Sequence, residues 1–221
     1  MNVVLYCEGP AEDRGNDALL PPPGDPMSGD HLGPAHTLVA RCIERTHRVP
    51  TPALRFLVPV RDAGKRVRGS DLHVPKLLRR VILNSITLHQ AKLVVALVDT
   101  DGDKSRRQVL LVATDNLAHA SQRVVAAAVQ EFEAWLLADQ RALRDVLGCA
   151  DTPPDPTQMA PGEAKSWLRN RVEARGLLAD QSQRAAEIRQ LRCQLAAQID
   201  LDTLARQPSF RQFLDDLLAA R

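Results

Sequence analysis

The sequence predicts an α/β protein in which helices cover a parallel β-sheet, with a helical extension at the C-terminus. Up to about residue 150, short runs of apolar and β-branched residues alternate with amphipathic segments of helical length. Such alternation favours a parallel sheet with helices on both faces. The 221 residues, of which 44% are hydrophobic, suffice for one sizeable core. We therefore expect an α/β domain over residues 1–150 and a helical extension over residues 151–221.

The expected strands and helices follow in order from the N-terminus. The run 3–7 is apolar and ends at Glu8-Gly9-Pro10, so a strand there places a carboxylate at its carboxyl end. The segment 16–33 is rich in Pro, Gly and Asp and predicts a long loop. The remaining expected strands are 54–60, 93–98 and 123–129, and the expected helices are 34–47, 71–89, 105–119 and a helix from about residue 130 to Gly148.

A change in composition marks the start of the extension. Residues 151–161 contain four prolines, and the segments 163–175, 182–198 and 209–220 then have helical patterns. We expect the helices after Pro161 to form a lid or a partner-binding element outside the sheet core.

Composition excludes several classes of protein. The longest apolar runs are far shorter than the roughly 20 residues of a membrane-spanning helix. The N-terminus has no basic residue before Glu8 and therefore predicts a strand, not a signal peptide. The cysteines Cys7, Cys42, Cys149 and Cys193 form no CxxC pair, which argues against a zinc site and, with the N-terminus, indicates a cytoplasmic protein.

The net charge of +2 is too small to predict nucleic-acid binding, but two stretches are locally basic. Ordinary solvated surface charge is one explanation for them. The other is contact with the phosphates of a nucleic-acid backbone, which gives affinity without sequence specificity. The candidates for such contacts are Lys65, Arg66, Arg68, Lys104, Arg106 and Arg107.

The strongest local signal is Asp99-Thr100-Asp101-Gly102-Asp103, directly after a buried-type strand. Carboxylates this close repel one another unless a cation compensates them, and Mg²⁺ or Mn²⁺ is a suitable hard cation. A surface turn is the simpler alternative, because Asp and Gly favour turns. An EF-hand calcium loop fails, since Lys104 and Leu110 stand where glycine and glutamate are needed.

Two families use an aspartate pair after a strand in this way. In a phosphatase of the haloacid-dehalogenase type, Asp99 would be the nucleophile. In a Toprim-type site, a glutamate after the first strand joins an Asp-x-Asp pair after a later one, and Glu8, Asp99 and Asp101 have that order. Since parallel strands end at the same edge of a sheet, we expect these three carboxylates to lie around a common point.

Three stretches carry a family resemblance. Residues 7–13 (CEGPAED) resemble the EGxxE opening of Toprim proteins of the overcoming-lysogenization-defect type. Residues 130–139 (QEFEAWLLAD) and 208–214 (PSFRQFL) are similar to a Toprim-like bacterial family of unknown function, number 4276, related to those nucleases. The resemblance implies a Toprim-like (Rossmann-like) sheet, nuclease activity and an AAA-type ATPase partner in phage defence.

The resemblance also implies roles for individual acids. Glu8 matches the Toprim glutamate, and Asp99 and Asp101 match the aspartate pair, so these three are the implied catalytic residues. The implied metal ligands are Glu8, Glu12, Asp99, Asp101, Asp103 and Glu133.

The position of Glu133 depends on the local structure. If the strand continues through this stretch, Glu131 and Glu133 point to the same side; if the stretch is helical, they lie about 200° apart. We expect Phe132 and Trp135 to be core residues and not platforms for stacked bases.

Three functions therefore stay open. The leading hypothesis is a Mg²⁺- or Mn²⁺-dependent phosphodiester hydrolase that acts on DNA or RNA together with a partner ATPase. The alternatives are a non-catalytic regulatory or adaptor subunit of an ATPase complex, and a small-molecule phosphatase of the haloacid-dehalogenase type. The sequence argues against a tyrosine-dependent topoisomerase, because the single tyrosine, Tyr6, lies within the first expected strand.

Overall fold

A four-stranded parallel sheet forms the centre of the computed structural model. The structure describes residues 1–9, 20–100, 103, 105–115, 117, 122–128, 131–148, 151–174 and 181–220. For residues 30 and 181–184 it describes the backbone and not the side chains. The strands are β1 (Asn2–Cys7), β2 (Arg55–Leu57), β5 (Leu93–Asp99) and β6 (Arg123–Ala128), in the order β2-β1-β5-β6. Because β1 and β5 are neighbours and Cys7 pairs with Leu97, Glu8 directly after β1 and Asp99 at the end of β5 lie at one edge of the sheet.

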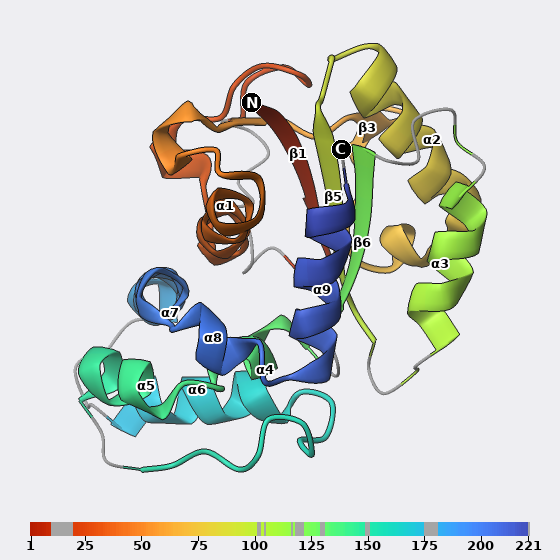
Figure 1. Ribbon diagram of the computed structural model, residues 1–221. Helices are drawn as coiled ribbons and strands as arrows, with labels where there is room; N and C mark the ends of the chain where they lie inside the picture. The colour runs from red at the N-terminus through yellow and green to blue at the C-terminus, as the bar shows by residue number, and fades with distance from the viewer. Residues whose placement is uncertain are drawn as a thin grey trace.

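Helices cover both faces of this sheet, as the α/β prediction required (Figure 1). Alternate residues of each strand point to opposite faces, so Leu5 and Val95 belong to one core cluster while Val4 and Val94 belong to the other. The first face carries α1 (Pro34–His47) and α9 (Pro208–Ala219), and the second carries α2 (Pro75–Thr87) and α3 (Ser105–Asp115).

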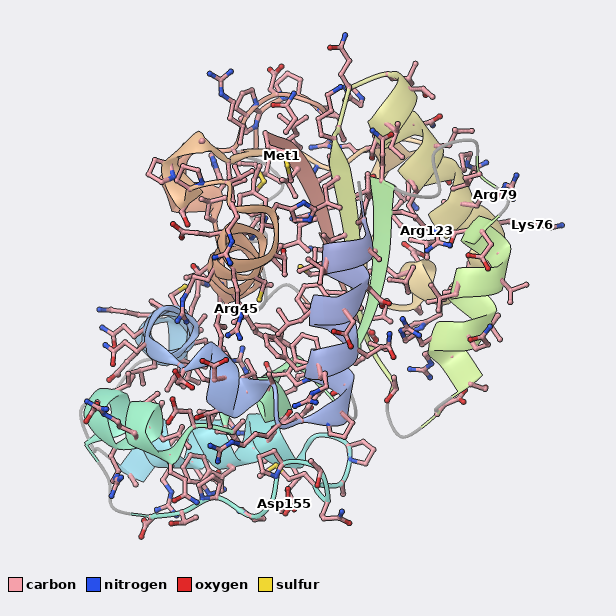
Figure 2. All side chains as sticks on the ribbon, viewed as in Figure 1. Met1, Arg45, Lys76, Arg79, Arg123 and Asp155 are labelled. Carbon is pink, nitrogen blue, oxygen red and sulfur yellow. The ribbon has the colours of Figure 1, made fainter. Side chains whose placement is uncertain are left out.

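A second group of helices lies beyond the carboxyl ends of the strands, below the sheet in Figure 1. Figure 2 shows side chains filling the space between this group and α1, where Arg45 of α1 pairs with Asp202 of α8. The group contains α4 (Phe132–Leu136), α5 (Gln140–Leu147), α6 (Glu163–Ala174), α7 (Gln181–Gln198) and α8 (Leu201–Leu204).

The helix expected from residue 130 to Gly148 is instead two short helices, α4 and α5. Asp139 causes the break, because its carboxylate accepts hydrogen bonds from the backbone N–H groups of Arg141 and Ala142, at 2.9 and 3.2 Å, and so caps α5. Its second oxygen accepts a hydrogen bond from the backbone N–H of Asp200 at 2.8 Å, which ties α5 to the start of α8.

The basic loop after β2 contains a small hairpin of β3 (Arg61–Asp62) and β4 (Lys65–Arg66). It leads into the 3-10 helix η4 (Gly69–His73), so α2 begins at Pro75 and not at residue 71 as expected. Gly69 adopts a left-handed conformation with φ of 57°, and its N–H donates to the carbonyl oxygen of Glu8 at 2.8 Å. This contact places the end of the basic loop next to β1. Two further 3-10 helices, η2 (Gly29–His31) and η3 (Thr51–Ala53), flank α1 in sequence.

The expectation that the helices after Pro161 lie outside the sheet core is wrong for α9. Helix α9 packs against β6 and α1, and one hydrophobic cluster runs from β1 to α9. In that cluster Trp135 stacks on Phe213 with ring centroids 5.7 Å apart and meets Phe210 edge to face at 5.0 Å. Trp135 is therefore a core residue, as expected. A domain division at residue 150 stays a prediction.

A search for membrane spans within the described ranges finds no helix with the length and apolar character to cross a bilayer.

We expect Phe213→Ala to lower the free energy of unfolding by about 3–5 kcal/mol, because it empties a fully buried position between α9 and Trp135. Urea unfolding monitored by circular dichroism measures the change. Leu218→Ala on the same helix is the control, since Leu218 is 61% exposed and its truncation is expected to cost less than about 0.5 kcal/mol. Equal costs for the two variants would contradict the assignment of α9 to the core.

Candidate functional site

Glu8 and Asp99 meet at the carboxyl edge of the sheet. The backbone N–H of Asp99 donates a hydrogen bond of 2.7 Å to Oε2 of Glu8. The same Glu8 oxygen lies 3.0 Å from Nε2 of His73, at the end of η4. The two strands are neighbours, as the sequence predicted, and this brings the Glu8 carboxylate to the backbone of Asp99 and to His73.

The Asp99 carboxylate is 3% exposed and contacts the chain through both of its oxygens. Oδ1 accepts a hydrogen bond of 2.8 Å from the backbone N–H of Phe132, the first residue of α4. Oδ2 accepts one of 3.2 Å from Nζ of Lys165 in α6. Asp99 thus connects the sheet to two of the helices beyond its edge.

The Lys165 ammonium lies among three carboxylates. Its Nζ is 3.2 Å from Oδ2 of Asp99, 3.4 Å from Oε2 of Glu131 and 3.7 Å from Oε2 of Glu133. Glu131 also accepts a hydrogen bond of 2.7 Å from the backbone N–H of Lys165, which satisfies a free donor in the first turn of α6. The sheet edge, α4 and α6 therefore converge on one cation.

Glu133 is the most deeply buried acid of this group, with no exposed surface. Its Oε1 lies 2.8 Å from Nη2 of Arg192 in α7, and the Arg192 side chain is itself only 10% exposed. Neither oxygen of Glu133 accepts a hydrogen bond of good geometry, although both have charged neighbours. Charge attraction, and not hydrogen bonding, therefore compensates Glu133.

Burial changes the proton affinity of these groups. It raises the pKa of the Asp99 carboxyl to about 7; Lys165 opposes this rise, and Glu133 and Glu8 add to it. For Lys165, burial by itself lowers the pKa, but Glu133, Asp99 and Glu131 together raise it above its ordinary value. Lys165 is therefore held in its charged form at neutral pH.

The other acids of the predicted metal site are not all brought together. Asp101 and Glu12 lie outside the residues that the structure describes. Asp103 is exposed and accepts hydrogen bonds from the backbone N–H and hydroxyl of Ser105, at 2.9 and 2.6 Å, at the start of α3. Glu131 precedes α4 with an extended backbone and Glu133 lies inside it, so neither expected periodicity applies, and both acids approach Lys165.

The predicted phosphate contacts fall into two groups. Arg106 is at the site and donates a hydrogen bond of 2.9 Å to the Asp99 carbonyl. Lys65 on β4 is exposed and Arg66 and Arg68 are half-buried, on the segment that leads to Gly69. Arg107 instead donates to the Val125 carbonyl at 3.2 Å and pairs with Asp216 of α9. Its contacts join α3, β6 and α9. Lys104 is not among the described residues.

Sequence reasoning missed His73, Lys165 and Arg192. A single histidine and two bases in helical segments carry no local signal, because their partners lie far away in the chain: Lys165 is 66 residues from Asp99. Glu131 was recognised in the sequence but not assigned to the site. Its position two residues before Glu133 was the one available hint.

A divalent metal suits the chemistry of this edge, because carboxylate oxygens are the ligands that Mg²⁺ and Mn²⁺ prefer and Glu133 has two buried oxygens without hydrogen bonds. As the side chains stand, however, no group of three acidic, histidine or cysteine residues within the described chain is arranged to hold an ion. The Lys165 ammonium lies where the carboxylates converge.

The chain matches a known family model over residues 34–218, from the start of α1 into α9. The family is described as a domain of unknown function, DUF4276. The chain belongs to this family. The match contains Asp99, Glu133 and Lys165, whereas Glu8 precedes it. Searches among the curated proteins and among the solved structures found no match.

We expect Arg192→Met to destabilise the protein by about 3–5 kcal/mol, because it leaves the buried Glu133 carboxylate without its closest cation. Thermal and urea unfolding measure the change. Adding Glu133→Gln to Arg192→Met is expected to recover part of the stability, since the uncompensated charge is removed. Arg189→Met on the same helix is the control, and a similar destabilisation there would assign the effect to the helix and not to the ion pair.

Proposed function

We propose that the chain is a Toprim-like, metal-dependent phosphodiester hydrolase that acts on DNA or RNA. The observation that carries the proposal is the meeting of Glu8 and Asp99 at the carboxyl ends of adjacent parallel strands, joined by the 2.7 Å hydrogen bond from Asp99 N–H to Glu8. In α/β sheets this edge is where ligands bind. The order of the acids along the chain is that of a Toprim site.

The proposal assigns the metal to Glu8 and Asp99, with Asp101 and Glu12 from the segments outside the described chain and Glu133 as a further acid. Bound Mg²⁺ or Mn²⁺ would polarise a phosphate oxygen and favour ionisation of water. The alternative role for Glu8, in place of metal ligation, is that of general acid or base, because its side chain is 19% exposed and reaches solvent, whereas Asp99 is buried.

The basic residues near this edge would bind the nucleic acid. Gly69 holds the end of the basic loop against Glu8, so Arg66 and Arg68 lie on the segment that approaches the site. Arg106, at the start of α3, contacts the backbone carbonyl of Asp99. Backbone phosphates flanking the scissile bond are the groups that these bases would contact.

Two other functions compete with this one. The burial of Asp99 and the hydrogen bonds to both of its oxygens argue against its use as a covalent nucleophile in a haloacid-dehalogenase-type phosphatase. A non-catalytic regulatory subunit is favoured by one observation: the acids already have protein cations, Lys165 and Arg192. The AAA-type ATPase partner and the role in phage defence rest on the family resemblance.

The direct test is cleavage of mixed DNA and RNA substrates by the purified chain with Mn²⁺ or Mg²⁺. We expect cleavage that EDTA abolishes, and a decrease of at least about 10²-fold in Glu8→Gln, because the amide keeps the hydrogen bond from Asp99 but carries no charge. Asp145→Asn, which removes an exposed carboxylate on α5, is the control and should retain activity. Full activity of Glu8→Gln would contradict the proposed site. Absence of metal-dependent cleavage would favour the regulatory subunit.

The nucleic-acid surface is tested by Arg66→Ala/Arg68→Ala. For each arginine–phosphate interaction that the double substitution removes, the slope of log affinity against log salt should fall by about 0.7–0.9, with the melting temperature unchanged. Fluorescence anisotropy with labelled DNA and RNA at several salt concentrations measures the slope. Arg141→Ala/Arg144→Ala on α5 removes the same charge from two exposed positions and should leave the slope unchanged. If both pairs change it equally, the binding surface is not the basic loop.

A further inference from the structure

Lys165 differs from the other cations of the site in where its charge lies. Its Nζ approaches Asp99, Glu131 and Glu133 within 3.2–3.7 Å, so one ammonium contacts three carboxylates from two separate segments. Arg192 contacts Glu133, and His73 contacts Glu8. Lys165 therefore occupies the point on which the oxygens of these three carboxylates converge.

We propose that Lys165 is an internal substitute for a divalent cation, and that a metal ion binds between Asp99, Glu131 and Glu133 only when the Lys165 side chain swings out. This inference takes the bound divalent metal from the proposed function. It adds that the C-terminal helices, through Lys165, control access of the ion. It also assigns Glu131 as a ligand.

The charges support an exchange of one cation for the other. With all three carboxylates ionised, the buried group carries three negative charges, and Arg192 supplies one positive charge that cannot leave because its side chain is 10% exposed. Without Lys165 the remaining charge is minus two, which a divalent ion neutralises. With Lys165 in place, one negative charge is left.

The geometry allows the exchange without unfolding α6. The backbone N–H of Lys165 is held by Glu131, so the first turn of the helix stays anchored while the side chain moves. The Lys165 side chain is 42% exposed, and its flexible stem gives the ammonium a path to solvent. The neutralising charge is thus movable in Lys165 and fixed in Arg192.

The first experiment compares Mn²⁺ binding by the full-length chain and by three variants. Electron paramagnetic resonance and calorimetry measure the binding. If the open state is populated at about 1–10%, removing its competitor tightens binding by about 10- to 100-fold, so Lys165→Met should bind Mn²⁺ that much more tightly than wild type. Lys165→Arg keeps the competing charge and should bind as weakly as wild type. Arg169→Met removes an exposed charge from the same helix and should have no effect.

The second experiment follows Lys165 itself in the wild-type chain and does not depend on a variant that folds. Mass spectrometry of limited acetylation should show slow modification of Lys165 without metal and at least several-fold faster modification with saturating Mn²⁺. Lys92, exposed at the opposite end of β5, is the internal control and should be modified equally in both conditions.

The outcomes separate this inference from the proposed function. Tighter binding by Lys165→Met together with faster acetylation supports it. Mn²⁺ binding that is equal or weaker in Lys165→Met, or that leaves the acetylation of Lys165 unchanged, overturns it while the proposed function stands. Absence of Mn²⁺ binding in every variant overturns both. Binding and exchange without cleavage of nucleic acid would support the inference and overturn the hydrolase.

Discussion

The structure depends on neutralising the carboxylates that gather at the carboxyl edge of the sheet. Asp99, Glu131 and Glu133 are nearly or fully buried, and an unpaired charge in such a position costs several kcal/mol. Lys165 and Arg192 supply the compensation from α6 and α7. Because these cations lie on the C-terminal helices, the sheet edge and those helices require each other.

Hydrophobic packing reinforces the same dependence. Two of the three stretches that carry the family resemblance, residues 130–139 and 208–214, meet in space: Trp135 from the first packs on Phe210 and Phe213 from the second. The indole N–H of Trp135 also donates a hydrogen bond of 3.0 Å to the hydroxyl of Ser209. A contact between α4 and α9 thus fixes the segment that presents Glu131 and Glu133, which explains in physical terms why both stretches belong to one pattern.

Local sequence signals predicted what depends on local structure. The helical pattern of residues 34–47 predicted α1 with its observed bounds, and the apolar runs predicted the central strands at whose ends Glu8 and Asp99 meet. The break at Asp139 was missed because its local cap on α5 interrupts a segment whose periodicity continues on both sides. The position of α9 in the core and the ion pairs of Lys165 and Arg192 were missed because they join segments far apart in the chain.

The acid cluster shows how far a sequence argument about metals can reach. Buried carboxylates need a compensating cation, and for Asp99, Glu131 and Glu133 a distant lysine supplies it. The sequence position of that lysine gives no warning of the contact. A compensating cation that can leave makes room for a metal ion, whereas one that cannot leave does not. Arg192 is enclosed, whereas the Lys165 side chain is 42% exposed and anchored only through its backbone N–H and its ion pairs. In the proposed exchange this cluster is a metal site with its competitor already bound, and the position of the Lys165 side chain, not of α6, determines when the ion can enter.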